Sequence, residues 1–309
     1  MKKTTFTLIA GLLISCAWTL TAQAQLARTF VSTTGNDANT CDRDAPCRNF
    51  IEAISKTVAG GEVTALDSGS YGRITVTKSL TIQGAPGAAV MVSRTGATNP
   101  VVFVNLDDQY KKVVLRNLQI SKPFGDGPNK GIEFFGAGSL HVENCVISGF
   151  DHDQTDTGIS ATFSVGPLDK NKLFLKDTII RDNAVGIQLG GTINASIDNC
   201  RIENNVIGVR VENKRTTISH SLMAGNLTGI EIHARATAYV ETCVVTNNNQ
   251  GIVTLKTESN GEGVVYVSNT GIFGNDTGIG GSGYSLSFGN NRLSNNNFNG
   301  MFTETLPQH

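Results

Sequence analysis

The chain has 309 residues, a formal net charge of −1 at pH 7 and only 17% charged residues. Because it has no excess of basic residues to neutralise phosphate groups, nucleic acid is not expected as a partner. Glycine occurs 34 times and aromatic residues make up 6% of the chain, a composition typical of short strands and tight turns rather than of helices.

The first 24 residues have the pattern of an export signal. Two lysines precede an apolar run over residues 6–20, and Ala-Gln-Ala at 22–24 is a small-x-small cleavage site. We therefore expect residues 1–24 to be a signal peptide. The mature chain would begin at Gln25 and reach the periplasm or the extracellular space.

A second interpretation of the same segment stays open. Leu-Ile-Ser-Cys at 13–16 resembles a bacterial lipobox, which would anchor the protein through a lipid on Cys16. Cleavage after Ala24 is favoured, because the apolar run continues past Cys16. The run is too short for a transmembrane helix and no later stretch qualifies, so no transmembrane segment is expected.

Residues 25–62 are predicted to cap one end of the fold. Phe50, Ile51, Ile54 and Val58 recur at a spacing that places them on one face of a short helix. Such a helix can cover the open end of a stack of strands, where bare edges would otherwise pair with other chains.

A repeat governs the rest of the chain. A glycine followed by an aliphatic residue recurs at Gly131-Ile132, Gly158-Ile159, Gly186-Ile187, Gly208-Val209, Gly229-Ile230, Gly251-Ile252, Gly278-Ile279 and Gly300-Met301. The glycine spacings are 27, 28, 22, 21, 22, 27 and 22 residues, so the shorter intervals define a basic coil and the longer ones carry insertions. An asparagine stands three residues before six of these glycines, at Asn183, Asn205, Asn226, Asn248, Asn275 and Asn297.

Each coil is predicted to contain a strand, an Asx turn, a second strand, an Asn turn and a Gly-Ile strand. Short strands of alternating polarity cannot bury a face alone, but stacking them about 4.8 Å apart buries a continuous core. Asparagine suits the turns because it tolerates left-handed geometry, and stacked amides can bond to one another.

The sequence therefore predicts an all-β fold, a right-handed parallel β-helix (a solenoid) with a short N-terminal capping helix. Residues 25–309 would form this single domain, with coils over 63–303 and a tail over 304–309. No cap is visible after Gly300, so we expect the last coil to be frayed or covered by another subunit in an oligomer.

The cysteines fall into two groups. Cys41 and Cys47 lie in a polar loop, where a disulfide is favoured over two free thiols in an exported chain. A metal site is a weaker interpretation, because no histidine lies nearby in sequence. Cys145, Cys200 and Cys243 occupy one inward column two coils apart, beyond disulfide reach, so we predict free, buried and inert thiols.

The opening of the mature chain resembles that of pectate-lyase-like right-handed β-helix proteins. The resemblance rests on Val31-Ser32, Gly35-Asn36-Asp37, Pro46-Cys47-Arg48, Ala53-Ile54, Gly60-Gly61, Gly69-Ser70-Tyr71 and Thr81-Ile82-Gln83-Gly84. The later Asn-x-x-Gly-Ile coils are similar to repeats of carbohydrate-binding proteins and sugar hydrolases with that fold. The resemblance implies the fold and a polysaccharide partner. The catalytic motifs of polygalacturonases, pectin methylesterases and classical pectate lyases are absent, so it implies no particular activity.

Outward residues of the Gly-Ile strands are the leading candidate for a site. Arg210, Glu212, Glu231 and His233 are expected to form a square on two neighbouring coils, with Gln188 one coil away. The leading hypothesis is that this face binds an extended polysaccharide. Uronate sugars in that polysaccharide would make it acidic. No catalytic activity can be assigned to the face from the sequence.

Three alternatives stay open for the same face. It could belong to a polysaccharide lyase or epimerase, with Glu231 or His233 as the base and Arg210 neutralising a uronate. It could belong to a structural envelope protein without a ligand. Its charges could also be solvated cross-strand pairs, Glu231 with Arg210 and Glu212 with His233, that contribute little energy.

A second polar cluster lies in the insertion before Gly158. Asp151, Asp153 and Asp156 supply the oxygen ligands that calcium prefers, although their spacing is not diagnostic. A solvated loop tip is the favoured interpretation. Apart from this calcium candidate, no cofactor is expected.

Overall fold

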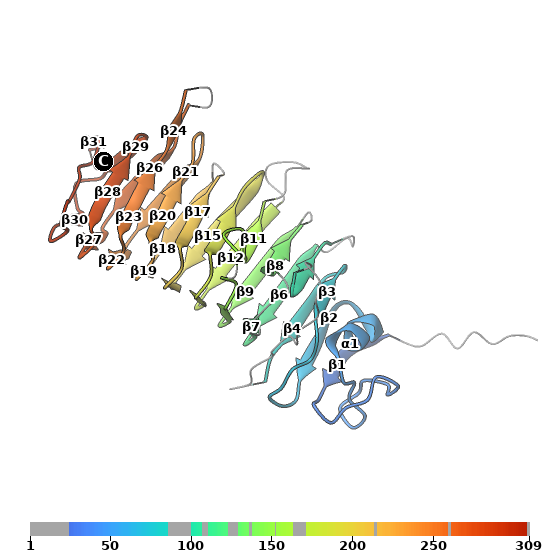
Figure 1. The fold of residues 1–309 in the computed structure, drawn as a ribbon. Helices are drawn as coiled ribbons and strands as arrows, with labels where there is room; N and C mark the ends of the chain where they lie inside the picture. The colour runs from blue at the N-terminus through green and yellow to red at the C-terminus, as the bar shows by residue number, and fades with distance from the viewer. Residues whose placement is uncertain are drawn as a thin grey trace, which may run out of the picture.

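The computed structural model describes residues 25–85, 100–106, 111–122, 129–135, 138–151, 153–162, 171–212, 215–258 and 261–307. The predicted signal peptide, with Cys16, lies outside the described residues. Three long parallel sheets form an elongated stack of coils, with the N-terminal helix at one end and the C-terminus at the other (Figure 1). Among the described residues, no helix is long and apolar enough to cross a membrane.

The strands of the three sheets follow one another in a fixed rotation. The twelve-stranded sheet contains β1 (Leu26–Val31), β2 (Thr57–Ala65), β4 (Leu80–Gln83), β6 (Lys112–Arg116), β9 (Ser139–Glu143), β12 (Asn171–Lys176), β15 (Ile193–Asp198), β18 (Thr216–Ser219), β21 (Thr237–Glu241), β26 (Val264–Ser268), β29 (Tyr284–Ser287) and β31 (Glu304–Thr305). The eight-stranded sheet contains β7 (Gln119–Ser121), β10 (Val146–Ser148), β13 (Ile179–Arg181), β16 (Arg201–Glu203), β19 (Leu222–Ala224), β22 (Val244–Thr246), β27 (Gly271–Phe273) and β30 (Arg292–Leu293).

The third sheet holds the Gly-Ile strands. Its nine strands are β3 (Ile74–Val76), β5 (Val102–Val104), β8 (Lys130–Phe134), β11 (Thr157–Ala161), β14 (Val185–Leu189), β17 (Ile207–Val211), β20 (Thr228–Ile232), β23 (Gln250–Thr254) and β28 (Thr277–Gly281). A short antiparallel hairpin, β24 (Lys256–Thr257) and β25 (Gly261–Glu262), projects from one coil. The predicted order of strands within a coil is confirmed.

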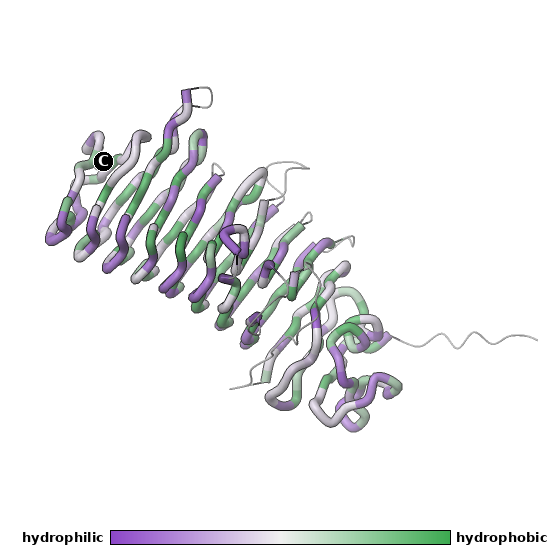
Figure 2. The backbone as a smooth tube through the Cα atoms, in the orientation of Figure 1, coloured by the Kyte–Doolittle hydropathy of each residue, from purple (hydrophilic) through white to green (hydrophobic). Residues whose placement is uncertain are grey.

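The coils stack in register, so that one aliphatic residue lies above the next. Ile159 is paired with Ile187, Ile187 with Val209 and Val209 with Ile230, and all four side chains are fully buried. In Figure 2 hydrophobic and hydrophilic segments alternate along the coils. Each strand therefore buries alternate residues in one continuous core, and the predicted parallel β-helix is confirmed.

A buried ladder of asparagine side chains holds the second turn of successive coils. The Oδ1 of Asn226 accepts hydrogen bonds from the backbone N and the Nδ2 of Asn205, at 2.9 and 3.0 Å, and the same pattern links Asn183 to Asn205 and Asn226 to Asn248. Each amide therefore satisfies buried donors of the coil before it, which would otherwise be costly to bury.

The ladder ends on a different residue from the one the repeat predicted. Asn275 donates to the Oδ1 of Asn296, whereas the Nδ2 of Asn297 donates to Asp276 on the surface. The last coil is therefore offset by one residue from the earlier repeats. For the same reason Gly300, with φ +71°, and Met301, 78% exposed, do not continue the Gly-Ile column.

The N-terminal helix α1 (Phe50–Lys56) lies over the first coils, as predicted, but its buried face differs. Phe50, Ala53 and Ile54 are buried, whereas Ile51 is 52% exposed. The chain leaves the helix at Thr57, which is already extended, so Val58 belongs to β2. Positions i, i+3 and i+4 share one face of a helix, which favours Ala53 over Ile51.

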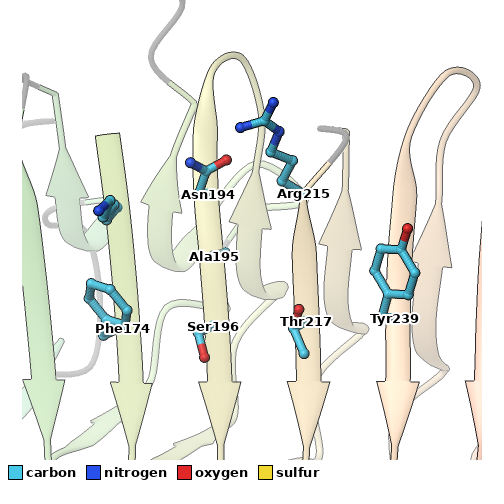
Figure 3. A pocket seen from close by; sticks show the side chains of 8 residues that line it. Phe174, Asn194, Ala195, Ser196, Arg215, Thr217 and Tyr239 are labelled. Carbon is cyan, nitrogen blue, oxygen red and sulfur yellow. The ribbon is translucent and has the colours of Figure 1, made fainter. Parts of the chain in front are cut away.

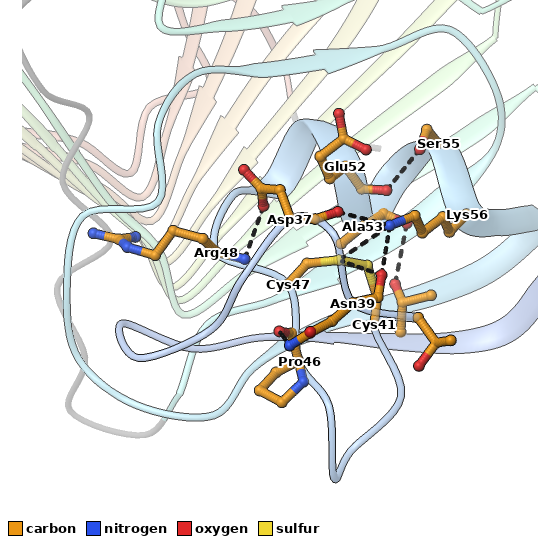
Figure 4. Close-up of a disulfide and its surroundings, with 12 residues drawn as sticks. Asp37, Asn39, Cys41, Pro46, Cys47, Arg48, Glu52, Ala53, Ser55 and Lys56 are labelled. Carbon is orange, nitrogen blue, oxygen red and sulfur yellow. Dashed lines mark hydrogen bonds between the residues drawn. A yellow bond between two sulfur atoms is a disulfide. The ribbon is translucent and has the colours of Figure 1, made fainter.

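The Cys41–Cys47 disulfide closes a loop beside this helix, which confirms the predicted pair. The Nζ of Lys56 donates to the backbone oxygens of Asn39 and Asp37, at 2.6 and 3.0 Å, and so ties the loop to the helix (Figure 4). The cap is thus held by both a covalent and a charge-assisted contact.

The three core cysteines are free and buried, as predicted. Burial raises the pKa of Cys145 and of Cys200 to about 12, and that of Cys243 to about 11. Because the thiolate is the reactive form of cysteine, these side chains act as small apolar residues of the core.

Candidate functional site

The predicted square on the Gly-Ile strands is only partly formed. Arg210 and Glu231 are direct neighbours on β17 and β20, and the Arg210 Nε donates to the Glu231 Oε1 at 2.9 Å. His233 does not pair with Glu212 as expected, because its Nε2 lies 2.7 Å from the same Glu231 oxygen. The Nε2 of Gln188 donates instead to the Oε2 of Glu212 at 3.5 Å.

The Glu231 carboxylate is poorly suited to proton abstraction. Burial alone would raise its pKa, but the hydrogen bonds from His233 and Arg210 outweigh burial and hold the pKa below its ordinary value. A carboxylate that is stabilised in its charged form is a weaker base. The contacts therefore favour the ion-pair interpretation of this face over the catalytic one.

The aspartates before Gly158 are not gathered around a common point. Asp151 and Asp153 are exposed, whereas Asp156 is buried and its Oδ2 lies 2.8 Å from the Lys122 Nζ. The side chains of Asp156 and Lys122 are only 3% and 4% exposed. The two residues therefore form a buried ion pair, and Asp156 is not part of a solvated loop tip. Among the described residues, no group of three or more His, Cys, Asp or Glu side chains is arranged to hold a metal ion.

The outer face of the twelve-stranded sheet carries a column of aromatic and small polar side chains. The register of β9, β12, β15, β18, β21 and β26 stacks His141, Phe174, Ser196, Thr217, Tyr239 and Tyr266 in this order. The rings of His141 and Phe174 stack with centroids 4.6 Å apart, and those of Tyr239 and Tyr266 with centroids 4.9 Å apart. Two aromatic pairs thus flank two small residues.

This gap forms a hollow of about 500 Å³, which we call the aromatic groove. Phe174 and Tyr239 stand on either side of Ser196 and Thr217, which form its floor (Figure 3). Asn194, near the start of β15, and Arg215, just before β18, line one rim (Figure 3). Lys172 also lines the groove and is paired with Asn194 in the strand register. The groove therefore combines two exposed rings, a small polar floor and a rim with two cations.

A second hollow of about 240 Å³ adjoins the groove and shares Phe174 and Ser196 with it. It is lined by His141, Glu143 and Asp198. Burial, with the positive charges of Lys112 and Arg116, lowers the pKa of His141 despite the nearby Glu143 carboxylate. A lowered pKa favours the neutral imidazole at pH 7, so the His141 ring extends the uncharged stacking surface of Phe174.

The sequence pattern pointed to the Gly-Ile strands as the candidate site and did not single out the aromatic groove. A signal for the groove exists at a fixed offset: each column residue lies three positions before the left-handed residue of the Asx turn. Phe174 precedes Asp177 in this way, and Tyr239 precedes Thr242. The insertions between coils hide this offset from a search for a constant period.

The comparisons with known proteins agree with the architecture. The family described as "Right handed beta helix region" matches residues 101–262. No curated protein matches the chain in sequence.

Solved structures of similar fold include a pectate lyase, a complex with xylose and a lacto-N-biosidase. Pectate lyase Pel9A shares 17% identity over 84% of this chain and 74% of its own, with a TM-score of 0.61. XylC in complex with xylose shares 10% identity over 91% of this chain and 72% of its own, with a TM-score of 0.56. The lacto-N-biosidase of family GH136 from Eubacterium ramulus shares 9% identity over 91% of this chain and 67% of its own, with a TM-score of 0.57. At these identities the likeness establishes the fold alone.

Proposed function

This chain belongs to the right-handed β-helix family, and we propose that it is an exported protein whose aromatic groove binds an extended acidic polysaccharide. The observation that carries the proposal is the pair of exposed rings, Phe174 and Tyr239, on either side of the small residues Ser196 and Thr217. Sugar rings present apolar C–H faces that stack on aromatic side chains, while their hydroxyl groups need polar partners.

The dimensions of the groove suit a linear chain. Phe174 and Tyr239 lie three coils apart, about 14 Å at the usual strand spacing of about 4.8 Å. Several sugar units of an extended chain fit between the two rings. Repeat folds commonly use such elongated faces for binding.

Charge favours an acidic ligand. Lys172 and Arg215 on the rim have no carboxylate within ion-pair distance among the described residues. Cations left without partners beside a groove attract carboxylate or sulfate groups and orient them.

Two further observations support the proposal. The disulfide between Cys41 and Cys47 suits an oxidising compartment, as export requires. The solved structures of similar fold include a pectate lyase and a lacto-N-biosidase, whose names denote enzymes that act on carbohydrates.

The other functions expected from the sequence stay predictions. A lyase or epimerase reaction would need Glu231 or His233 to accept a proton, and both are engaged in one ion-paired cluster with Arg210. A structural envelope protein without a ligand would leave the exposed rings of the groove unexplained. Calcium binding at Asp151, Asp153 and Asp156 also stays a prediction, with Asp156 held in an ion pair by Lys122.

Calorimetric titration of the mature chain with acidic and neutral polysaccharides tests the proposal. We expect Phe174→Ala and Tyr239→Ala each to weaken binding of an acidic chain by about fivefold or more, because stacking on an aromatic ring contributes about 1 kcal/mol or more. Phe273→Ala is the matched control: Phe273 and Phe174 are each 37% exposed, but Phe273 lies on the eight-stranded sheet. Equal loss in the control and in the groove variants would contradict the proposal.

A further inference from the structure

The central outward column of the twelve-stranded sheet has two unlike halves. The sheet runs from β1 at the capped end of the stack to β31 at the C-terminal end, with six strands on each side of the boundary between β12 and β15 (Figure 1). In strand order the column is Arg28, Glu62, Thr81, Val114, His141, Phe174, Ser196, Thr217, Tyr239, Tyr266, Leu286 and Glu304. Small side chains in one half thus stand as far from the boundary as large ones in the other.

This column is complementary to itself in reverse order. A twofold axis parallel to the strands, between β12 and β15, would place β12 of one copy over β15 of a second copy and β1 over β31. Every ring of the column would then face a smaller side chain of the second copy. The facing pairs are Phe174 with Ser196, His141 with Thr217, Tyr239 with Val114 and Tyr266 with Thr81. Packed sheets lie about 10 Å apart with interdigitating side chains, which a large residue opposite a small one allows.

Charges match in the same arrangement. At the ends of the strands Asp198 would face Lys176 of the second copy, and Glu241 would face Arg116. The third carboxylate of this rim, Glu143, would face a serine. Because each contact occurs twice about the axis, the two matched contacts give four ion pairs. At the starts of the strands, cations would face only neutral residues: Lys172 with Asn194, Arg215 with Ser139 and Lys112 with Thr237.

A shift by one coil in either direction removes the match. One shift would set Phe174 against Phe174 of the second copy and Glu143 against Asp198. The opposite shift would set Glu143 against Glu241, and rings would again meet rings. Like charges that face each other disfavour a wrong pairing. Size and charge therefore specify the same single register.

The area of the face suits a stable interface. Twelve strands about 4.8 Å apart and about 17 Å long cover roughly 900 Å² on each copy, and a standard interface buries about 800 Å² per partner. The aromatic side chains supply apolar contact, and the charged rims fix the orientation.

We propose that two copies of this chain form an isologous dimer through the twelve-stranded sheet, with antiparallel stacks and the twofold axis between β12 and β15. The proposal goes beyond the function proposed above, since the dimer needs no ligand. The second copy covers the aromatic groove, so that a polysaccharide in the groove competes with the dimer.

Sedimentation velocity of the mature chain over a range of protein concentrations tests the proposal. We expect the wild type to have twice the mass of one chain. Glu241→Arg should weaken the dimer by about tenfold or more, because it replaces two ion pairs with contacts between like charges. Glu203→Arg is the matched control, on β16 of the eight-stranded sheet, and should leave the dimer intact.

A second charge reversal identifies the contact itself. Arg116 and Glu241 lie five strand steps apart in one chain, about 24 Å at the usual spacing, so they cannot pair with each other within that chain. We expect the double substitution Arg116→Glu with Glu241→Arg to recover the dimer that Glu241→Arg weakens.

Three results would overturn the proposal. The first is the mass of a single chain at every concentration of the wild type. The second is a dimer that Glu241→Arg leaves unchanged, or that the double substitution fails to recover. The third is a dimer that persists while an acidic polysaccharide is bound in the groove, with binding that Tyr239→Ala abolishes. We expect instead that such a polysaccharide converts the dimer to single chains.

Discussion

Single residues in left-handed conformation make the sharp corners of each coil. The first turn has such a residue in every coil from Asn117 to Asn269, with φ between 46° and 53°. Most of these positions are Asn or Asp, which tolerate this conformation. Thr242 is the exception with a branched Cβ, and its φ is 53°. A β-branched side chain is strained in this conformation.

Thr242→Asn is therefore expected to stabilise the protein by about 1 kcal/mol, since left-handed backbone costs other residues roughly 1–2 kcal/mol. The new amide can still accept the hydrogen bond that the Asn269 Nδ2 donates to the Thr242 hydroxyl. The midpoint of denaturant unfolding measures the effect. Thr237→Asn, in the strand β21, is the control and should not stabilise, because asparagine is unfavourable in strands. A lower midpoint for Thr242→Asn would contradict the strain argument.

At the scale of elements, the asparagine ladder joins the turns of successive coils. Asn226 is buried, and its Oδ1 satisfies two donors of Asn205. Asn226→Ala leaves the backbone N–H of Asn205 without an acceptor inside the protein, whereas the Asn205 Nδ2 still donates to the backbone oxygens of Glu203 and Ile180. We expect a loss of about 1–3 kcal/mol, the cost of one unsatisfied buried donor.

Asn297→Ala tests the register of the last coil in the same unfolding assay. Asn297 lies on the surface beside Asp276, so its substitution should change stability by about 0.5 kcal/mol or less. Asn296→Ala should cost more, because Asn296 accepts two hydrogen bonds from Asn275. A larger loss of stability in Asn297→Ala than in Asn296→Ala would contradict this register and support the one expected from Gly300.

The repeat allowed the coils to be predicted because one offset fixes both the turn and the buried strand. Asn226 and Gly229 illustrate it: the amide enters the ladder and the glycine lies against the backbone oxygen of Gly251 in the next coil. The end of the repeat was missed because three asparagines in a row, Asn295 to Asn297, satisfy the pattern in more than one register. Only stacking against Asn275 decides among them.

The candidate site could be predicted only in part. The neighbours Arg210 and Glu231 follow from the repeat, since the register of the Gly-Ile strands is regular. The contact of His233 with Glu231 rather than with Glu212 does not follow from the repeat, because it depends on side-chain rotamers rather than on strand register. The aromatic groove depends on Phe174 and Tyr239, which are 65 positions apart with insertions of different length between them.

The whole molecule is a prism with three outer faces and two unlike ends. The cap of α1 covers the first coils, whereas the last coil leaves Phe298 66% exposed and Met301 78% exposed. Association through this C-terminal end stays a prediction. The three faces also differ: the twelve-stranded sheet carries the aromatic groove, and the nine-stranded sheet carries the cluster of Arg210, Glu231 and His233.

The measurement that tests the central claim most directly is the melting temperature of three proteins with and without an acidic polysaccharide. A ligand that binds only the folded state raises this temperature. The proteins are the wild type, the groove variant Phe174→Ala with Tyr239→Ala, and the Gly-Ile-face variant Arg210→Ala with Glu231→Ala. We predict that the ligand-induced rise persists in the Gly-Ile-face variant and disappears in the groove variant. A rise that persists in the groove variant and disappears in the Gly-Ile-face variant would contradict the account.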